Sequence, residues 1–218
     1  MEFLFVGCSV TWGDELKHRF SDRYSKLVCK ALGATETNIA ECARSNDWIA
    51  RRTVEETRKK KYDRVYVQLT VPSRIEYFTE GTGEGLRFKL KMKGVEQVAA
   101  KMYYGNFYNA RLGIENLYKN KFIIESAVTD TELIFISFDS SHEENEKQYR
   151  HIHDNAHWNS FCKIESIQIF EDILEGYKVV KNRLGPRGHP LESDHQKIAD
   201  YLLSCLLYTS DAADDVAS

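Results

Sequence analysis

Short apolar runs alternate along this chain with helix-length amphipathic segments, and this alternation is what most restricts its fold. The apolar runs fall at residues 2–7, 36–41, 64–70 and 132–138. Amphipathic segments at 14–32 and 46–60 separate the first three runs. Runs of this kind suit strands that are buried on both faces of a parallel sheet, and parallel strands need crossover helices. The pattern predicts a three-layer α/β/α sandwich with a central parallel sheet, a flavodoxin-like fold.

The second half of the chain predicts three more helices and two insertions. One helical segment carries its apolar residues on a single face, namely Ala110, Ile114, Leu117, Ile124 and Val128. Further helices are expected at about 164–180 and 191–204. The stretches at about 77–106 and 142–163 follow neither period, and we expect them to be lid-like insertions.

The carboxyl-terminal residues differ in kind from the rest. From Cys205 to Asp215 the sequence resembles the reading-frame translation of a transposase end used in sequencing libraries. We therefore expect residues 205–218 to be a non-native tail and residues 1–204 to form a single domain.

Charge and cysteine content restrict the partners and the compartment. The 218 residues hold 30 basic and 33 acidic side chains, and three of the acids lie in the expected tail. This balance gives no electrostatic reason to expect nucleic acid or a membrane as partner. No leader-like start and no stretch of about 18 apolar residues is present, so we expect a cytoplasmic or otherwise leaderless protein. The five cysteines show no ligand-like spacing, which indicates reduced thiols.

A serine follows the first expected strand, in the run Gly7–Asp14. Open α/β sheets carry their sites at the carboxyl ends of strands. A helix beginning here would place Ser9 where unpaired N–H groups favour a developing oxyanion. The alternative is a residue that only makes a tight bend or caps a helix.

A histidine near the other end of the chain would supply the base that such a serine needs. His189 lies in a Gly/Pro-framed turn just before the last expected helix, and histidine is the usual base because its pKa lies near neutrality. His195, on the apolar side of that helix, is expected to be packed or capping. The histidines between 142 and 157 lack the usual zinc spacing, so we expect no metal and no other cofactor.

The two ends together resemble the SGNH (GDSL-type) hydrolase family. The matching pieces are Gly7–Asp14 and Gly188–Ala199. The chain is similar in particular to the divergent branch met in tailed bacteriophages, where a Ser-Asn pair and a Thr-x-x-x-Arg follow strands two and three, as Ser45–Asn46 and Thr70–Arg74 do here. The resemblance implies Ser9 as nucleophile and His189 as base. It implies oxyanion or substrate contacts at Ala43, Arg44, Asn46, Thr70 and Arg74.

The chain departs from that family at two supporting positions. The family has an aspartate two or three residues before its histidine, where this chain has Arg187 and Pro186. By sequence, Asp139 and Asp194 are the nearest replacements. The family's second-block glycine falls near Ala43 or Arg44, and Thr70 stands near the place of its third-block asparagine.

These observations predict a serine esterase or acylhydrolase that uses a small-molecule or glycan ester, with deacetylation of a carbohydrate as one activity. The missing aspartate keeps open a catalytically impaired module that binds glycans or serves as a phage structural, virion-associated component. A flavodoxin-like nucleotide binder is a third reading. The bulky Val10 and Trp12 argue against it, because a phosphate-cradling loop needs small residues there.

Overall fold

A five-stranded parallel sheet forms the centre of the computed structural model, which describes residues 1–77, 86–87, 95–137, 166–168 and 189–214. Its strands are β1 (Glu2–Val6), β2 (Thr35–Asn38), β3 (Arg64–Leu69), β6 (Glu132–Ser137) and β7 (Ser166–Gln168). They lie in the order β2-β1-β3-β6-β7, and every pairing is parallel. This doubly wound order confirms the predicted fold class. The four predicted strands are present, and each ends one to three residues earlier than predicted.

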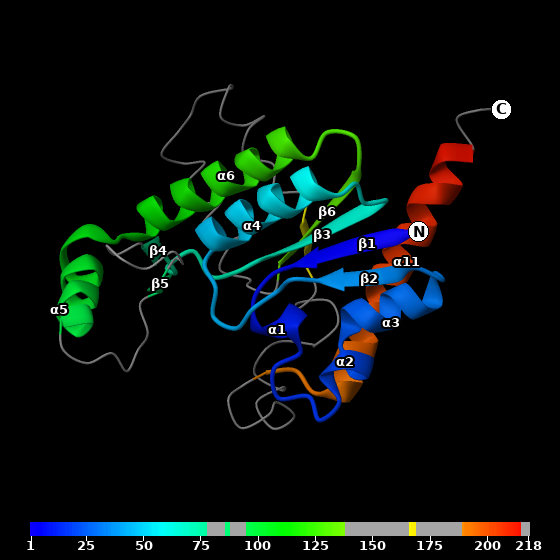
Figure 1. The fold of residues 1–218 in the computed structure, drawn as a ribbon, viewed down its shortest axis with the longest axis horizontal. Coiled ribbons are helices and arrows are strands. Elements are labelled where there is room, and N and C mark those ends of the chain that lie inside the picture. Colours follow the sequence, from blue (N-terminus) through cyan, green and yellow to red (C-terminus); the bar gives the residue numbers. More distant parts are fainter. Residues whose placement is uncertain (78–85, 88–94, 138–165, 169–188, 215–218) are drawn as a thin grey trace.

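Helices cover both faces of the sheet (Figure 1). On one face, α4 (Asn46–Lys59) and α6 (Ala110–Ala127) pack on strand residues such as Leu4 and Val67. On the other, α3 (Tyr24–Ala31) and α11 (Glu192–Asp214) pack on Phe5 and Tyr66. Successive residues of β1 and β3 therefore pack into opposite cores, which is why these central strands are largely apolar. The edge strand β2, with the sequence Thr-Glu-Thr-Asn, is polar. α4 and α6 confirm two predicted helices, and α11 extends ten residues beyond the predicted end at 204.

The prediction of one helix over 14–32 is wrong. That part of the chain forms α1 (Ser9–Trp12), α2 (Arg19–Asp22) and α3. Gly13 and Glu15 adopt left-handed backbone angles, with φ of 79° and 72°, and Arg23 is extended between α2 and α3. A residue outside the right-handed helical region ends a helix whatever the apolar period around it.

The predicted helix at 164–180 is also wrong at its start. Ser166–Gln168 forms β7, in register with Phe135–Ser137 of β6. An alternating polar–apolar triplet can pair with a strand that would otherwise be the edge of the sheet, and this pairing overrides the helical pattern. The rest of the predicted helix lies outside the described residues.

Part of the expected insertion at 77–106 forms regular elements outside the central sheet. It contains the antiparallel pair β4 (Glu76–Tyr77) and β5 (Leu86–Arg87), the helix α5 (Val95–Met102) and a π-helical turn, η1 (Tyr103–Phe107). Figure 1 shows α5 set away from the sheet, beyond the first turn of α6. The expected insertion at 142–163 lies outside the described residues.

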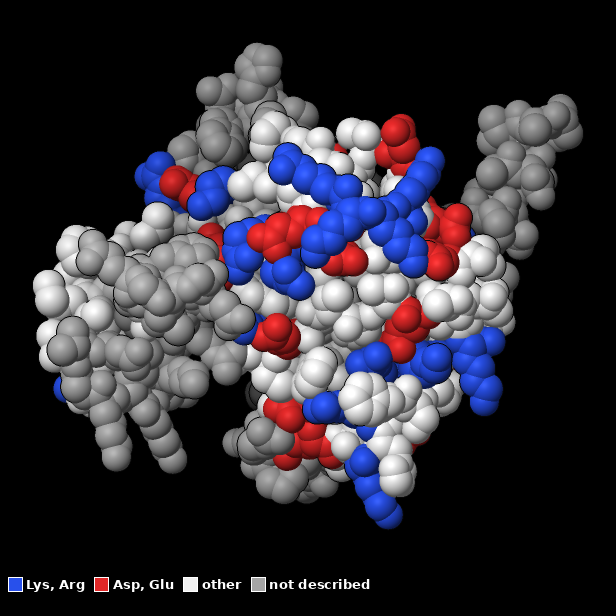
Figure 2. Space-filling view, in the orientation of Figure 1, with Lys and Arg blue, Asp and Glu red and all other residues white. Residues whose placement is uncertain are grey.

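Charges on the outer face of α4 are paired with one another. Arg51 contacts Glu55 and Glu76, and Arg52 also contacts Glu55. Acidic and basic side chains accordingly alternate over this helix in Figure 2. Within the described ranges, no helix combines the length and the apolar character that crossing a membrane requires.

Candidate active site

The loops after β1, β2 and β3 meet at one edge of the sheet. β1 lies between β2 and β3 in the sheet. The chain therefore passes from β1 to β2 on one side of β1, and then crosses to β3 on the other side. In open α/β sheets the ligand site forms at such a switch point, outside the carboxyl ends of the strands. The predicted residues Ser9, Ala43, Thr70 and Arg74 all follow these three strands, Ser9 at the start of the short helix α1 and the other three on loops.

Ser9 is the first residue of α1, and Gly7 and Cys8 separate it from the end of β1. Its side chain is largely buried, with a relative exposure of 7%, and its Oγ lies 3.9 Å from Cys8 Sγ. α1 is a single turn that ends at Gly13, whose N–H donates to Ser9 O at 3.0 Å. The expected long helix is therefore absent after Ser9, and what remains to favour an oxyanion is the first-turn N–H groups, which have no partner within a helix.

Gln68 of β3 fixes the shape of this turn. Its Oε1 accepts from Cys8 N at 3.1 Å, Thr11 N at 3.2 Å and Thr11 Oγ1 at 2.6 Å, and its Nε2 donates to Cys8 Sγ at 3.1 Å. A Cβ on Gly7 would lie 2.7 Å from Gln68 Cβ, so only glycine permits this close approach. The buried amide thereby joins the turn that carries Ser9 to the neighbouring strand.

A positive charge lies close to the thiol beside Ser9. Arg74 Nη1 donates to Thr70 Oγ1 at 2.8 Å and to Arg44 O at 3.4 Å. Burial raises the pKa of the Cys8 thiol, but Arg74, Thr70 and Gln68 outweigh this effect and leave the pKa below its ordinary value. The loop after β3 can therefore stabilise negative charge near the start of α1.

Asn46 joins the start of α4 to the end of β3. Its Nδ2 donates to Thr70 O and its Oδ1 accepts from Thr70 N, both at 2.9 Å. The side chain is 2% exposed, and the pair uses both ends of the amide. A contact between Asn46 and substrate stays a prediction.

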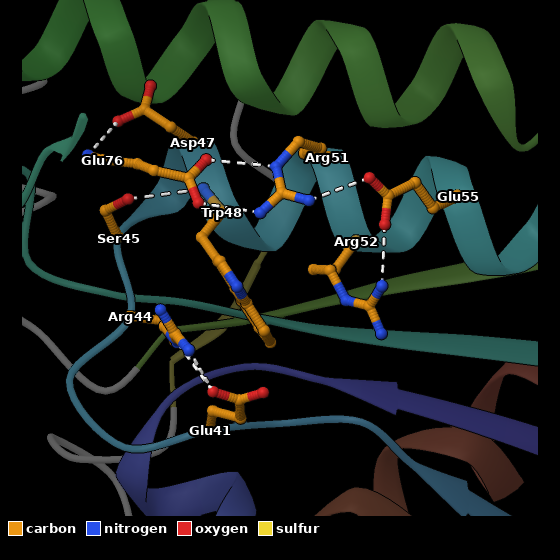
Figure 3. Close-up of polar contacts among 9 residues, drawn as sticks. All are labelled: Glu41, Arg44, Ser45, Asp47, Trp48, Arg51, Arg52, Glu55 and Glu76. Carbon is orange, nitrogen blue, oxygen red and sulfur yellow. Dashed lines mark hydrogen bonds and ion pairs between the residues drawn. The ribbon is translucent and has the colours of Figure 1, made fainter. Parts of the chain in front are cut away.

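The loop after β2 brings a left-handed residue to the site. Ala43 has a φ of 57°, in the region that favours glycine, and it lies where the family resemblance expects a glycine. The next residue, Arg44, donates from Nε to Glu41 Oε2 at 2.8 Å, and its guanidinium lies 4.9 Å from the centre of the Trp48 ring. Figure 3 shows Arg44 and Glu41 directed toward each other, with Ser45 as the cap of α4.

His189 contacts the loop that begins with Ser9. Its Nδ1 lies 2.8 Å from Glu15 Oε2, and its backbone N–H donates to the same oxygen at 3.1 Å. Asp14 Oδ2 is farther away, 3.8 Å from Nδ1. Within the described residues no hydrogen bond joins Ser9 to His189, and the bonds of His189 go to Glu15.

The carboxylate beside His189 is thus neither of the two that the sequence suggested. Asp194 is buried, and its Oδ2 accepts from Leu191 N at 3.4 Å at the start of α11. Asp139 lies outside the described residues. Glu15 and Gln68 were not among the predicted site residues. Gln68 could have been noticed as an amide inside an apolar strand, but Glu15 has no local signal, since its partner is 174 residues away.

His195 is packed and caps a helix, as predicted. The side chain is fully buried, and its Nδ1 accepts from Tyr24 N, at the start of α3, at 3.1 Å. The two rings stack with centroids 5.9 Å apart. Burial lowers the pKa of His195 to about 4, so the ring is neutral at ordinary pH and keeps the lone pair that the cap requires.

The histidines between 142 and 157, for which the sequence predicts no metal site, lie outside the described residues. In the part that is described, no three His, Cys, Asp or Glu side chains gather as a metal site.

The structure resembles solved hydrolase structures at low sequence identity. No protein-family model matches the chain, and a comparison with curated protein sequences finds no match. A member of the lipolytic protein G-D-S-L family from Veillonella parvula is 14% identical, with a TM-score of 0.55 over 94% of this chain and 97% of that one. The psychrotrophic esterase EstA from Pseudoalteromonas sp. is 9% identical, with a TM-score of 0.57 over 96% and 98% of the two chains.

An acetyl xylan esterase from the rumen bacterium Butyrivibrio proteoclasticus is 13% identical, with a TM-score of 0.54 over 96% of this chain and 64% of that one. At such identities the likeness establishes the fold: the chain has the α/β/α architecture of the G-D-S-L lipolytic structures.

Proposed function

We propose that this chain is a serine esterase or acylhydrolase in which Ser9 is the nucleophile and His189 the general base. The observation that carries the proposal is the pair of hydrogen bonds from His189 to Glu15, six residues after Ser9 in the same loop. This contact ties the imidazole to the segment that follows Ser9, near the switch point of the sheet where such folds form their sites, and so supports pairing the two residues.

In the proposed reaction, Ser9 Oγ attacks the ester carbonyl carbon and its proton passes to His189 Nε2. The tetrahedral intermediate then expels the alcohol, which takes the proton from His189, and the acyl group stays on Ser9. Water attacks this acyl-enzyme by the same proton path, releases the acid and restores both residues. N–H groups of Ser9 and of the Ala43–Arg44 turn are the proposed donors to the oxyanion, with Arg74 near them.

Acetyl groups on a carbohydrate are the proposed substrate class. A similar structure is an acetyl xylan esterase, and the exposed tyrosine Tyr104, whose hydroxyl donates to Ser73 O at 3.0 Å, lies next to the loop that carries Arg74. Membership of the phage branch and association with a virion are part of the same proposal, and their support is the sequence resemblance alone.

The second candidate is a glycan-binding or phage structural module that has lost catalysis. The observation that favours it is the missing hydrogen bond between Ser9 and His189 in the described residues. Catalytic hydrogen bonds often tighten only with substrate present, so this gap does not decide between the two candidates.

Replacement of Ser9 by alanine separates them. We expect Ser9→Ala to lower kcat/KM for a short-chain aryl ester at least about 10³-fold, because the nucleophile is lost. A fluorophosphonate probe should label the unmodified protein at Ser9, as read by peptide mass spectrometry. Ser21→Ala, at an exposed serine of α2, should keep both activity and labelling. Full activity in Ser9→Ala, or no labelling of Ser9, would refute the proposal.

A further inference from the structure

We infer that Glu15 takes the place of the acid that this chain lacks before its histidine, and that it acts as the positioning residue for His189. The inference rests on the proposed function. It places the acid in the loop of the nucleophile, whereas the resemblance to the SGNH family expects it just before the base.

The contact sets the tautomer of the imidazole. An ionised carboxylate can only accept hydrogen bonds, so His189 Nδ1, 2.8 Å from Glu15 Oε2, must carry the proton. Nε2 is then the nitrogen with a free lone pair, which is the form a general base needs. The backbone N–H of His189 donates to the same oxygen at 3.1 Å, so the ring and the main chain are held by one atom.

The surroundings strengthen this contact. The side chain of Glu15 is 6% exposed and that of His189 is 20% exposed, and charges attract more strongly where water is largely excluded. When His189 takes the proton of Ser9 it becomes a cation, and an adjacent buried carboxylate stabilises that cation. Asp14 Oδ2, at 3.8 Å, is too far for a hydrogen bond but adds a second negative charge.

The backbone at Glu15 is adapted to this contact. Glu15 has a φ of 72°, which L residues rarely adopt, and it comes two residues after Gly13, with a φ of 79°. These two left-handed residues turn the chain back after α1. Non-glycine residues in this region cluster where function maintains the strain. If Glu15, in the segment that follows Ser9, supplies the acid, no carboxylate is needed at positions 186 and 187, where the sequence has proline and arginine.

Three variants and one spectrum test the inference. Glu15→Gln should lower kcat about 10²- to 10⁴-fold with little change in KM, because an amide no longer fixes the tautomer or stabilises the imidazolium. Glu15→Asp should recover part of the activity. Asp14→Asn is the matched control, and its loss should stay under about tenfold, since Asp14 makes no hydrogen bond to His189 and an asparagine Oδ1 can still accept from Glu15 N.

The spectrum is the imidazole ¹⁵N signal of His189 in the unmodified protein, recorded at alkaline pH, which should show a proton on Nδ1. A proton on Nε2 would overturn the inference. So would a Glu15→Gln protein that loses labelled active sites but keeps the wild-type kcat per labelled site. If the unmodified protein hydrolyses esters and labels at Ser9, either of these two outcomes refutes only the role of Glu15. An unmodified protein that neither hydrolyses esters nor labels at Ser9 refutes the proposed function and this inference with it.

Discussion

Ala43 occupies a backbone conformation that its side chain disfavours. Its φ of 57° lies in the left-handed region, where a Cβ clashes with the following carbonyl oxygen and costs roughly 1–2 kcal/mol. The N–H of this turn is a proposed oxyanion donor, and it is unaffected by the side chain. The strain therefore affects stability at this residue and leaves the proposed donor in place.

Replacing Ala43 by glycine should raise the free energy of unfolding by about 0.5–1 kcal/mol. Relief of the left-handed strain exceeds the entropy that glycine adds to the unfolded chain. Urea unfolding followed by circular dichroism measures the change. Ala50→Gly, in the middle of α4 and 2% exposed, should have the opposite sign, a loss of about 1 kcal/mol or more. Destabilisation by both variants would show that Ala43 is not strained.

Between elements, Gln68 is the main polar connection from β3 to the turn after β1. Three donors in that turn converge on its Oε1. The segment after β1 contains the single-turn helix α1 and two residues with left-handed backbone angles, Gly13 and Glu15. Little local structure therefore stabilises it, and its geometry depends on the neighbouring strand.

Gln68→Leu should lower the free energy of unfolding by about 2–4 kcal/mol, because the donors of Cys8 and Thr11 are left buried without an acceptor. Thermal and urea unfolding would measure this. Gln196→Leu, at an exposed glutamine of α11, is the matched control and should stay within about 0.5 kcal/mol of the parent. A Gln68→Leu variant as stable as this control would show that the network contributes nothing to the fold.

The elements predicted correctly are those with a strong local period. The strands β1, β3 and β6 and the helices α4 and α6 have long apolar patterns that sequence alone reveals. The errors arose where distant contacts or single backbone angles decide. β7 forms because β6 lies beside it, and the helix expected from residue 14 is broken by Gly13 and Glu15. In the site, strand-end positions predicted Ser9, whereas the contact between Glu15 and His189 joins opposite ends of the chain.

For the whole molecule, His195 links stability to pH. The pKa of His195 is about 4 in the folded chain, against 6.5 for an unburied histidine, and burial is the main cause. At a pH between these two pKa values, His195 is mostly protonated in the unfolded chain and mostly neutral in the folded chain. Stability from this residue is therefore fully present above pH 6.5 and falls as the pH drops toward 4.

The loss over that interval should amount to at most about 3 kcal/mol, measured as the free energy of urea unfolding at a series of pH values. His195→Asn offers a neutral acceptor to Tyr24 N and should give a flatter profile between pH 6.5 and 4, whatever its stability at neutral pH. Equal slopes for the two proteins would show that His195 is not the group responsible.

The segment that begins at His189 makes contacts across almost the whole chain. Glu192 accepts from Lys17 N, His195 caps α3, and His189 contacts Glu15, over separations of 171 to 175 residues. On the ribosome the amino-terminal residues emerge first, so Ser9 is synthesised long before its proposed base. Until residue 189 has been made and α11 has docked on α3, the nascent chain holds a serine without its imidazole. On the proposed function, activity would begin with the same docking event that completes the second layer of helices, and a prematurely terminated chain would be inert toward esters.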